Sequence, residues 1–398
     1  MRQRSLVKIA ILSASAVALA ACSNSSDGDG GGGGLTGGNN GGGSSNGKTY
    51  TIGFQGPLSG DNQQLGINER NAVELAVEQA NASGDLPFTL KYTEADDVGA
   101  PATAPPAAQK LIQDDSVVAV VGPSFSGATK AVGANYAAAN LAIVSPSATN
   151  STLTSQGFST FFRVVPPDSA QGKQAADYIA KKTKTSIYLI DDTSEYGTGL
   201  ATDIENELKA KGAKYVREGV ADTTQDYSAI AAKVAASGAD VLYYAGYYSG
   251  ASLFAKALVS AGYKGLAVSG DGSKDAQFIA GAGAAGEGWE FTCPCADATV
   301  DPNMKSFADA YQKKWNTPSS TYSPEAFDAT NAIIEVMKDI DGDITREKVV
   351  DGLKKVNYKG LTNTVKFSSS GEIEKAVVFL YQVKGGKLAL VGTVDSQL

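Results

Sequence analysis

Histidine is absent from this 398-residue chain. Its absence excludes Ser-His-Asp and Cys-His nucleophile systems and nearly every catalytic zinc arrangement. A Ser-Lys hydrolase needs no histidine, but the spacing Ser-x-x-Lys occurs only at Ser5/Lys8 and Ser45/Lys48, close to the N-terminus. We therefore expect a protein that is not an enzyme and that holds no metal ion and no cofactor.

Long apolar runs are missing after the N-terminal segment. Positive charges within residues 2–8 precede an apolar stretch at 9–19, which is too short to cross a bilayer and is followed by small residues. Residues 1–21 are therefore predicted to be a signal peptide. Cys22 comes next and resembles the cysteine of the bacterial lipobox, which is lipidated and becomes the first mature residue. The alternative is an ordinary secretory signal that contains a cysteine.

Residues 22–47 consist almost entirely of Gly, Ser, Asn and Asp after Cys22. Such a segment cannot bury enough apolar surface to offset its ordering entropy, so we expect a flexible tether. Cleavage after residue 21 would remove three positive charges and no acidic residue, which changes the net charge from −8 to −11. That charge argues against a nucleic-acid partner. We expect an extracytoplasmic monomer anchored to the cell membrane as a lipoprotein.

Two cysteines remain in the body of the chain, Cys293 and Cys295, in "FTCPCAD". In an exported protein they are expected to be oxidised. A Cys-x-Cys disulfide is a candidate, because a bend at Pro294 would favour it, and plain structural thiols are the alternative. Two thiolates alone make an incomplete zinc site.

From residue 48 onward, short β-rich runs alternate with amphipathic helical stretches. This alternation occurs twice along the chain, as an internal repeat. Strands are expected at 49–54, 88–96, 117–122 and 141–145, and again at 186–192, 213–220, 240–246 and 265–271. Helices are expected near 66–82, 101–114, 126–139, 168–182, 197–211, 226–237 and 250–262. This alternation is typical of βαβ units, so the predicted class is α/β with two doubly wound parallel-sheet lobes.

The remaining residues are predicted to return to both lobes. Helices are expected near 302–315, 324–340 and 345–356, followed by apolar β-rich runs that would complete both sheets. The predicted first lobe is 48–165 plus 296–362, and the second is 166–295 plus 363–398. The lobes would be joined by a hinge of several strands. Ligands of parallel sheets bind at the carboxyl ends of the strands, which points to a cleft between the lobes.

The segment "AVVGPSFSGATKAV" (119–132) has the layout of a phosphate-binding loop. Its two glycines, Gly122 and Gly127, match the opening of a Walker A motif. Ala128 and Thr129 stand where Lys and Ser/Thr are required, and Lys130 comes two positions late. We interpret the segment as an anion site for a carboxylate.

Several stretches together resemble the type I periplasmic binding proteins for branched-chain amino acids and related small amides, which are the extracellular receptors of bacterial uptake ABC transporters. They are "IGFQGPLSG", "VVGPSFSGATK", "IVSPSATNSTL", "FFRVVPPDSAQG", "IDDTSEYGTGL", "DVLYYAGYYSGASLF", "SGDGSKDAQF" and "YSPEAFDAT". No single stretch is diagnostic, but their order is that of the family. The resemblance covers nearly the whole chain after residue 48.

The resemblance implies a head-group site for a zwitterion. Ser126, with nearby backbone N–H groups, would bind the ligand carboxylate. Ser147 would offer its backbone carbonyl, and Thr149 its hydroxyl, to the ligand ammonium. Asp271 would pair with that ammonium. The alternatives are plain helix N-caps for Ser126 and Thr149 and a turn residue for Asp271.

The resemblance also implies a lid and a side-chain pocket. Tyr196 and Tyr247 match aromatic residues that close over the ligand from the second lobe, although they could be rim or core aromatics. Leu65 stands where the family often has an aromatic residue. Ser147 adds a hydroxyl where alanine is common, and Asp271 is one methylene shorter than glutamate. These departures bear on the preferred ligand side chain.

The function that the resemblance implies is capture of a small amino acid, branched-chain or a related aliphatic or amide ligand. The ligand would be delivered to a membrane permease that works with separate ATPase subunits, since the chain has no complete P-loop of its own. A ligand sensor of the same fold that does not transport is the alternative. An exported enzyme is the third, and the missing histidine counts against it.

Overall fold

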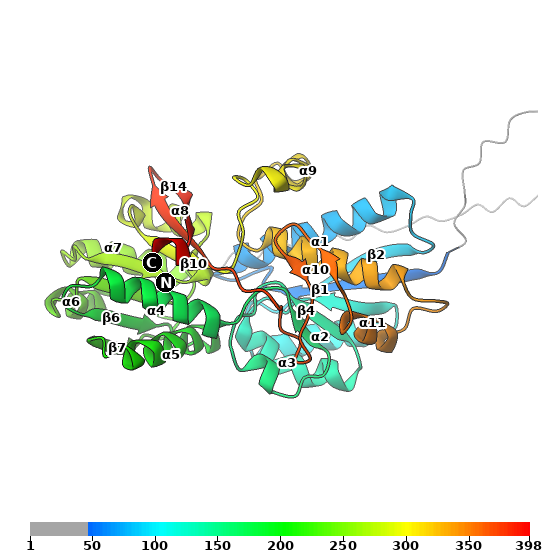
Figure 1. Cartoon of the computed structure of the whole chain (residues 1–398), viewed down its shortest axis with the longest axis horizontal. Coiled ribbons are helices and arrows are strands. Elements are labelled where there is room, and N and C mark those ends of the chain that lie inside the picture. The colour runs from blue at the N-terminus through cyan, green and yellow to red at the C-terminus, as the bar shows by residue number, and fades with distance from the viewer. Residues whose placement is uncertain (1–46) are drawn as a thin grey trace, which may run out of the picture. The chain divides into compact units, whose positions relative to one another are not determined.

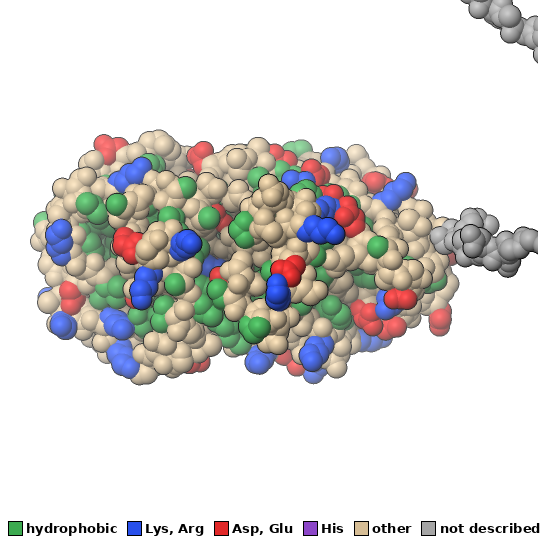
Figure 2. All heavy atoms as spheres, turned by 90° about the horizontal axis from the view of Figure 1, so that it is seen from above, with side chains coloured by type: hydrophobic (Ala, Val, Ile, Leu, Met, Phe, Trp, Pro, Cys, Tyr) green, Lys and Arg blue, Asp and Glu red, His purple; other side chains and the backbone are tan. Residues whose placement is uncertain are grey.

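The structure is a computed structural model, and it describes residues 47–398. The predicted signal peptide, lipidated Cys22 and tether up to residue 46 lie outside the described residues. Among the helices of residues 47–398, none is long and apolar enough to cross a membrane. On the face drawn in Figure 2, acidic and basic side chains of this part are interspersed, without a continuous basic patch.

The first lobe is built on a parallel sheet of five strands. They are β1 (Thr49–Gly56), β2 (Thr89–Asp96), β3 (Val117–Val121), β4 (Ala142–Ser145) and β5 (Phe161–Arg163), in the order β2-β1-β3-β4-β5. Helices α2 (Ala104–Ile112) and α3 (Ser126–Ala138) cover one face; α1 (Gln63–Ser83), α10 (Ser323–Lys338) and α11 (Arg346–Leu353) cover the other (Figure 1). Because both faces are covered, the central strands are continuous apolar runs.

The second lobe repeats this arrangement. Its strands β6 (Ile187–Asp191), β7 (Tyr215–Gly219), β8 (Val241–Ala245), β9 (Leu266–Ser269) and β10 (Glu290–Cys293) follow the order β7-β6-β8-β9-β10. Antiparallel β13 (Phe379–Lys384) and β14 (Lys387–Thr393) extend the sheet beyond β10. Helices α4 (Asp168–Lys182) and α5 (Glu195–Ala210) cover one face; α6 (Ser228–Ala236), α7 (Tyr248–Ser260) and α8 (Ala276–Ala282) cover the other. The predicted α/β class with two parallel-sheet lobes is confirmed.

The C-terminal segments depart from the expectation that they complete both sheets. They extend the second sheet only, while β11 (Tyr358–Lys359) and β12 (Thr364–Val365) form a separate two-stranded sheet. Val365, Phe367 and Ile373 are buried in the first lobe's core, where β12 contacts α10 and the Phe367 ring packs against Phe162 of β5. The first lobe therefore continues about ten residues past the predicted boundary at 362.

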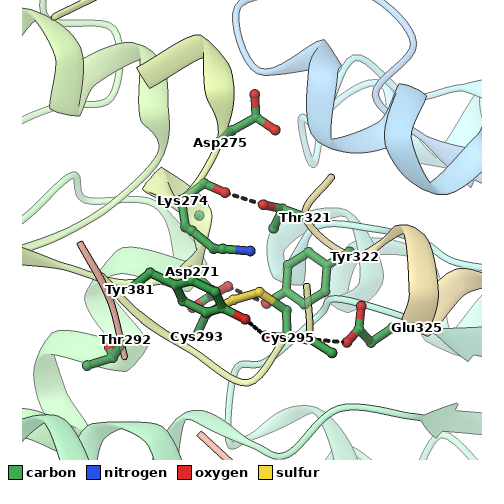
Figure 3. Close-up of a disulfide and its surroundings, with 12 residues drawn as sticks. Asp271, Lys274, Asp275, Thr292, Cys293, Cys295, Thr321, Tyr322, Glu325 and Tyr381 are labelled. Carbon is green, nitrogen blue, oxygen red and sulfur yellow. Dashed lines mark hydrogen bonds between the residues drawn. A yellow bond between two sulfur atoms is a disulfide. The ribbon is translucent and has the colours of Figure 1, made fainter. Parts of the chain in front are cut away.

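Three segments cross between the lobes, near residues 164–167, 294–296 and 374–377. The second crossing begins at a disulfide between Cys293 and Cys295, whose Cα atoms are 5.1 Å apart. Figure 3 shows this disulfide beside Asp271, Tyr322 and Tyr381. The Tyr381 hydroxyl donates to the Cys295 carbonyl at 2.8 Å. Of the two states that the sequence left open, the structure has the disulfide.

Candidate functional site

Six of the seven predicted binding residues line one small cavity between the lobes. Its volume is about 10 Å³, and Glu69, Ser124, Phe125, Gly272 and Tyr322 complete its lining. The predicted residues that line it are Leu65, Ser126 and Ser147 from the first lobe and Tyr196, Tyr247 and Asp271 from the second. Parallel strands bring these residues together, because the loops after them all emerge at the carboxyl ends of the two sheets.

Thr149 is the predicted residue that does not line the cavity. It is fully buried, and its Oγ1 has no hydrogen-bond partner among the described residues. Its carbonyl accepts from the backbone N–H of Asp168 at 2.7 Å, at the start of α4. Thr149 therefore lies behind the cavity wall, beside the N-terminus of the second lobe's first helix.

Ser126 is the first residue of α3, and it does not cap that helix. Its Oγ accepts from the backbone N–H of Asn150 at 3.2 Å instead, so the N-cap alternative for Ser126 is wrong. The helix makes its first backbone bond from Thr129 to Phe125. The N–H groups of residues 126–128 are thus free of helical partners, which gives the site the partial positive charge of a helix N-terminus.

The glycine and lysine of the same segment have structural roles. Gly122 has a φ of 109°, and a Cβ at this position would lie 2.2 Å from the carbonyl oxygen of Gln55 on β1. Only glycine is compatible with that close approach. Lys130 points across the cleft, where its Nζ lies 2.7 Å from Oε1 of Glu195. Lys130 is therefore an interlobe contact of the first lobe with α5.

Hydroxyl groups tie the two loops of the first lobe together. Ser147 Oγ donates to the carbonyl of Ser124 at 2.7 Å, and Ser124 Oγ donates to Oε2 of Glu69 at 2.5 Å. The additional hydroxyl of Ser147 thus contributes to the scaffold of the site. These bonds connect the loops after β3 and β4 to the middle of α1.

Asp271 is fully buried in a 3₁₀ turn, Asp271–Ser273, and its carboxylate is held by three donors. Tyr196 and Gln171 donate to Oδ1 at 2.8 and 2.9 Å, and Tyr322 donates to Oδ2 at 2.6 Å. Burial raises the pKa of Asp271, and these hydrogen bonds oppose that shift. A carboxylate oxygen accepts about two hydrogen bonds, so Oδ2 retains capacity for one more donor.

Aromatic rings close the cavity from both lobes. Phe125 of the first lobe stacks on Tyr247 of the second, with centroids 4.3 Å apart and an interplanar angle of 24°. Tyr196 packs against the same Tyr247 ring at 5.1 Å. Tyr247 therefore takes part in the contact between the lobes, while Tyr196 lines the cavity and also belongs to the second lobe's core, as the core alternative for it describes.

Five lining residues have no predicted role, and three of them have side chains that bear on the site: Phe125, Tyr322 and Glu69. Phe125 precedes Ser126 directly, and Tyr322 opens the stretch "YSPEAFDAT", so both lie in motifs that carry the family resemblance. Glu69 is a carboxylate on the buried face of α1, between Leu65 and Val73. A charged residue in the middle of an apolar helix face was the available signal for Glu69.

Glu69 is fully buried, and its Oε1 has no hydrogen-bond partner among the described residues. Burial raises the pKa of Glu69 to about 8, although the hydrogen bond from Ser124 lowers it. The pKa of Asp168, at the start of α4 in the second lobe, is also raised well above its usual value. Burial is the largest cause, and the negative charge of Asp271 is the second. The site therefore combines several buried carboxyl groups.

A larger groove of about 600 Å³ adjoins the small cavity and shares Phe125, Tyr196 and Tyr247 with it. Four carboxylates line the groove, and no lysine or arginine is among the described residues of its lining. The carboxylates are Asp61, Asp192, Glu195 and Asp222. No group of three or more Cys, Asp or Glu side chains in residues 47–398 has metal-binding geometry.

Comparisons with known proteins identify the family. A family model described as periplasmic binding protein matches residues 49–387. The chain belongs to the periplasmic binding protein family. The resemblance predicted from the sequence is thus confirmed. Because this is a family of binding proteins, the prediction that the chain is not an enzyme is confirmed as well.

Relatives are similar over most of the chain. The leucine-, isoleucine-, valine-, threonine- and alanine-binding protein of Pseudomonas aeruginosa is 28% identical over 84% of this chain and 90% of its own length. The leucine-specific-binding protein of Salmonella typhimurium is 30% identical, over 72% of this chain and 78% of its own. Among solved structures, the substrate binding protein LivJ of Streptococcus pneumoniae in complex with isoleucine has a TM-score of 0.79. It is 26% identical and covers 87% of this chain and 100% of its own.

A further neighbour shows the fold alone. A solute binding protein of Rhodopseudomonas palustris in complex with benzoate has a TM-score of 0.76, at 19% identity and over 87% of this chain and 96% of its own. The same architecture thus accommodates ligands with and without an ammonium group. The chemistry of the site has to decide between them.

Proposed function

We propose that this chain is the extracytoplasmic substrate-binding protein of an ABC uptake transporter and that it binds an amino acid between its lobes. The observation that carries the proposal is the polarity of the cavity. Ser126 and the N-terminus of α3 suit a carboxylate, while Asp271 on the opposite lobe suits an ammonium group. An aromatic acid such as benzoate would leave Asp271 buried without a cation.

Contacts between the lobes support capture by closure. Lys130 and Glu195, Phe125 and Tyr247, and Asn150 Nδ2 and the Glu195 carbonyl (2.8 Å) all connect the two lobes. A ligand that touches both lobes favours the closed arrangement by its difference in affinity for the two states. Membrane permease and ATPase subunits are the proposed partners, and a lipid on Cys22 is the proposed anchor.

A ligand panel tests the proposal. Thermal shift and calorimetry on the mature chain should include the protein amino acids, small amides, benzoate and sugars. We expect at least one amino acid to raise the unfolding temperature, since it binds only the folded state. If benzoate or a sugar stabilises the protein and no amino acid does, the proposal is wrong.

A further inference from the structure

One carboxyl oxygen in the lining of the small cavity, Oε1 of Glu69, is free to accept a hydrogen bond from a ligand. Glu69 lines the cavity from the first lobe, and only its Oε2 is engaged, by Ser124. Its Oε1 is buried and has no hydrogen-bond partner among the described residues. A buried carboxylate oxygen without a donor costs free energy, so a ligand that brings a donor to Oε1 gains the corresponding amount.

The charges around the cavity favour a cation as that donor. Glu69 and Asp271 line it from opposite lobes, and no lysine or arginine is among the described residues of its lining. The nearby buried cations are engaged elsewhere. Arg163 is paired with Glu372, and the Lys274 ammonium lies 4.0 Å from the centroid of the Tyr381 ring. The single α-ammonium of an aliphatic amino acid would engage one of the two lining carboxyl groups and leave the other without a cationic partner.

The charged side chains that line the adjoining groove are also acidic. Glu195 is paired with Lys130, and the other three carboxylates of the groove attract cations toward the Phe125–Tyr247 pair, which lines both the groove and the inner cavity. The faces of these aromatic rings are themselves favourable to a cation. The path into the site and the site itself thus select for positive charge.

We propose that the ligand is an amino acid with a second cationic nitrogen at the end of its side chain, and that Glu69 binds that nitrogen. The inference rests on the proposed function, because Asp271 is assigned to the α-ammonium. It gives the site a substrate class, a basic amino acid, that differs from the uncharged side chains of the amino acids named for the relatives. Glu69 is then the residue that determines this specificity.

The test uses two amino acids of equal side-chain length. Ornithine ends in an ammonium where norleucine ends in a methyl group, so their affinities report on the terminal group alone. Calorimetry on the mature wild-type chain should give roughly tenfold or tighter binding of ornithine than of norleucine. In Glu69→Gln this ratio should fall roughly tenfold or more, with norleucine affinity little changed. Glu74→Gln is the matched control, because it makes the same substitution on α1 outside the cavity.

Each outcome of these titrations either supports or overturns the inference. Tighter binding of norleucine than of ornithine by wild type overturns the inference without any variant, and it leaves the proposed function intact. A preference for ornithine that persists in Glu69→Gln overturns the assignment of Glu69. Binding of no amino acid at all overturns the proposed function and the inference together. Loss of the preference in Glu69→Gln, but not in Glu74→Gln, supports the inference.

Discussion

At the scale of single residues, Asp271 is where the proposed ligand chemistry can be tested most directly. Its carboxylate is already held by Tyr196, Tyr322 and Gln171, so an amide in its place would keep the shape of the turn and lose the charge. We expect Asp271→Asn to weaken amino-acid binding by roughly 10- to 100-fold. Calorimetry with the amino acid and with its 2-oxo acid, which lacks the ammonium, measures the effect. Equal loss for both compounds would contradict an ammonium-binding role.

A second residue, Arg163, supports the wall of the site from behind. Its guanidinium is fully buried, bonds Glu372 at 2.7 Å and donates to the carbonyls of Ala148 and Asn150. Arg163→Met leaves these acceptors without a donor, and we expect a loss of about 2–4 kcal/mol in the free energy of unfolding. Urea titration measures it.

The control for Arg163 is a surface ion pair close in sequence to its partner Glu372. Lys366→Met removes the partner of Glu374, 2.9 Å away, and both side chains are about half exposed. We expect a change below about 1 kcal/mol. Similar losses in the two variants would show that Arg163 has no special structural role.

Residue-level prediction from the sequence depended on the motifs. Ser126, Ser147 and Asp271 lie in loops whose order is readable along the chain, and the structure brings them to one cavity. Glu69 lies in the middle of a helix, 55 residues before its partner Ser124. The contact between this helix face and the loop of Ser124 is tertiary, so it cannot be predicted from a local sequence pattern.

At the scale of elements, most strands and helices were predictable, including the four-residue strands β4 and β9, and a few short elements were not. Both sheets follow the expected alternation, but β5, β10 and α8 have three, four and seven residues. These three segments hold few periodic positions, and their packing against neighbouring elements defines them. Val365, Phe367 and Ile373 are scattered among polar residues, and their packing in the first lobe's core is a tertiary contact that the assignment of 363–398 to the second lobe did not anticipate.

The contact of α3 with α7 across the cleft gives an element-scale prediction. Tyr247, at the N-cap of α7, stacks on Phe125, at the N-cap of α3. Tyr247→Leu keeps an apolar side chain and removes the ring, so we expect affinity to fall roughly threefold to tenfold. Small-angle scattering should show a larger radius of gyration without ligand. Tyr215→Leu on β7, away from the cleft, is the control, and the same expansion there would contradict the prediction.

At the scale of the whole molecule, buried carboxyl groups should make stability depend on pH in one direction. Burial is the main cause that raises the pKa of Glu69 and Glu325 to about 8 and of Asp97, Asp192 and Asp328 to about 6. These groups bind protons more tightly in the folded chain than in the unfolded chain. The free energy of unfolding should therefore fall as the pH rises from about 4.5 to about 8.

Groups with lowered pKa act in a different window, which makes the trend measurable. The pKa of Asp240 is lowered because hydrogen bonds from Thr183 and its neighbours outweigh the effect of burial, and its contribution is lost only below about pH 4. Urea titrations of the ligand-free chain at pH 5.5 and pH 7.5 should thus differ by roughly 2–5 kcal/mol in favour of pH 5.5. Glu69→Gln removes one titrating group and should reduce the difference, whereas equal stability at both pH values would mean that these carboxyl groups reach water in the folded protein.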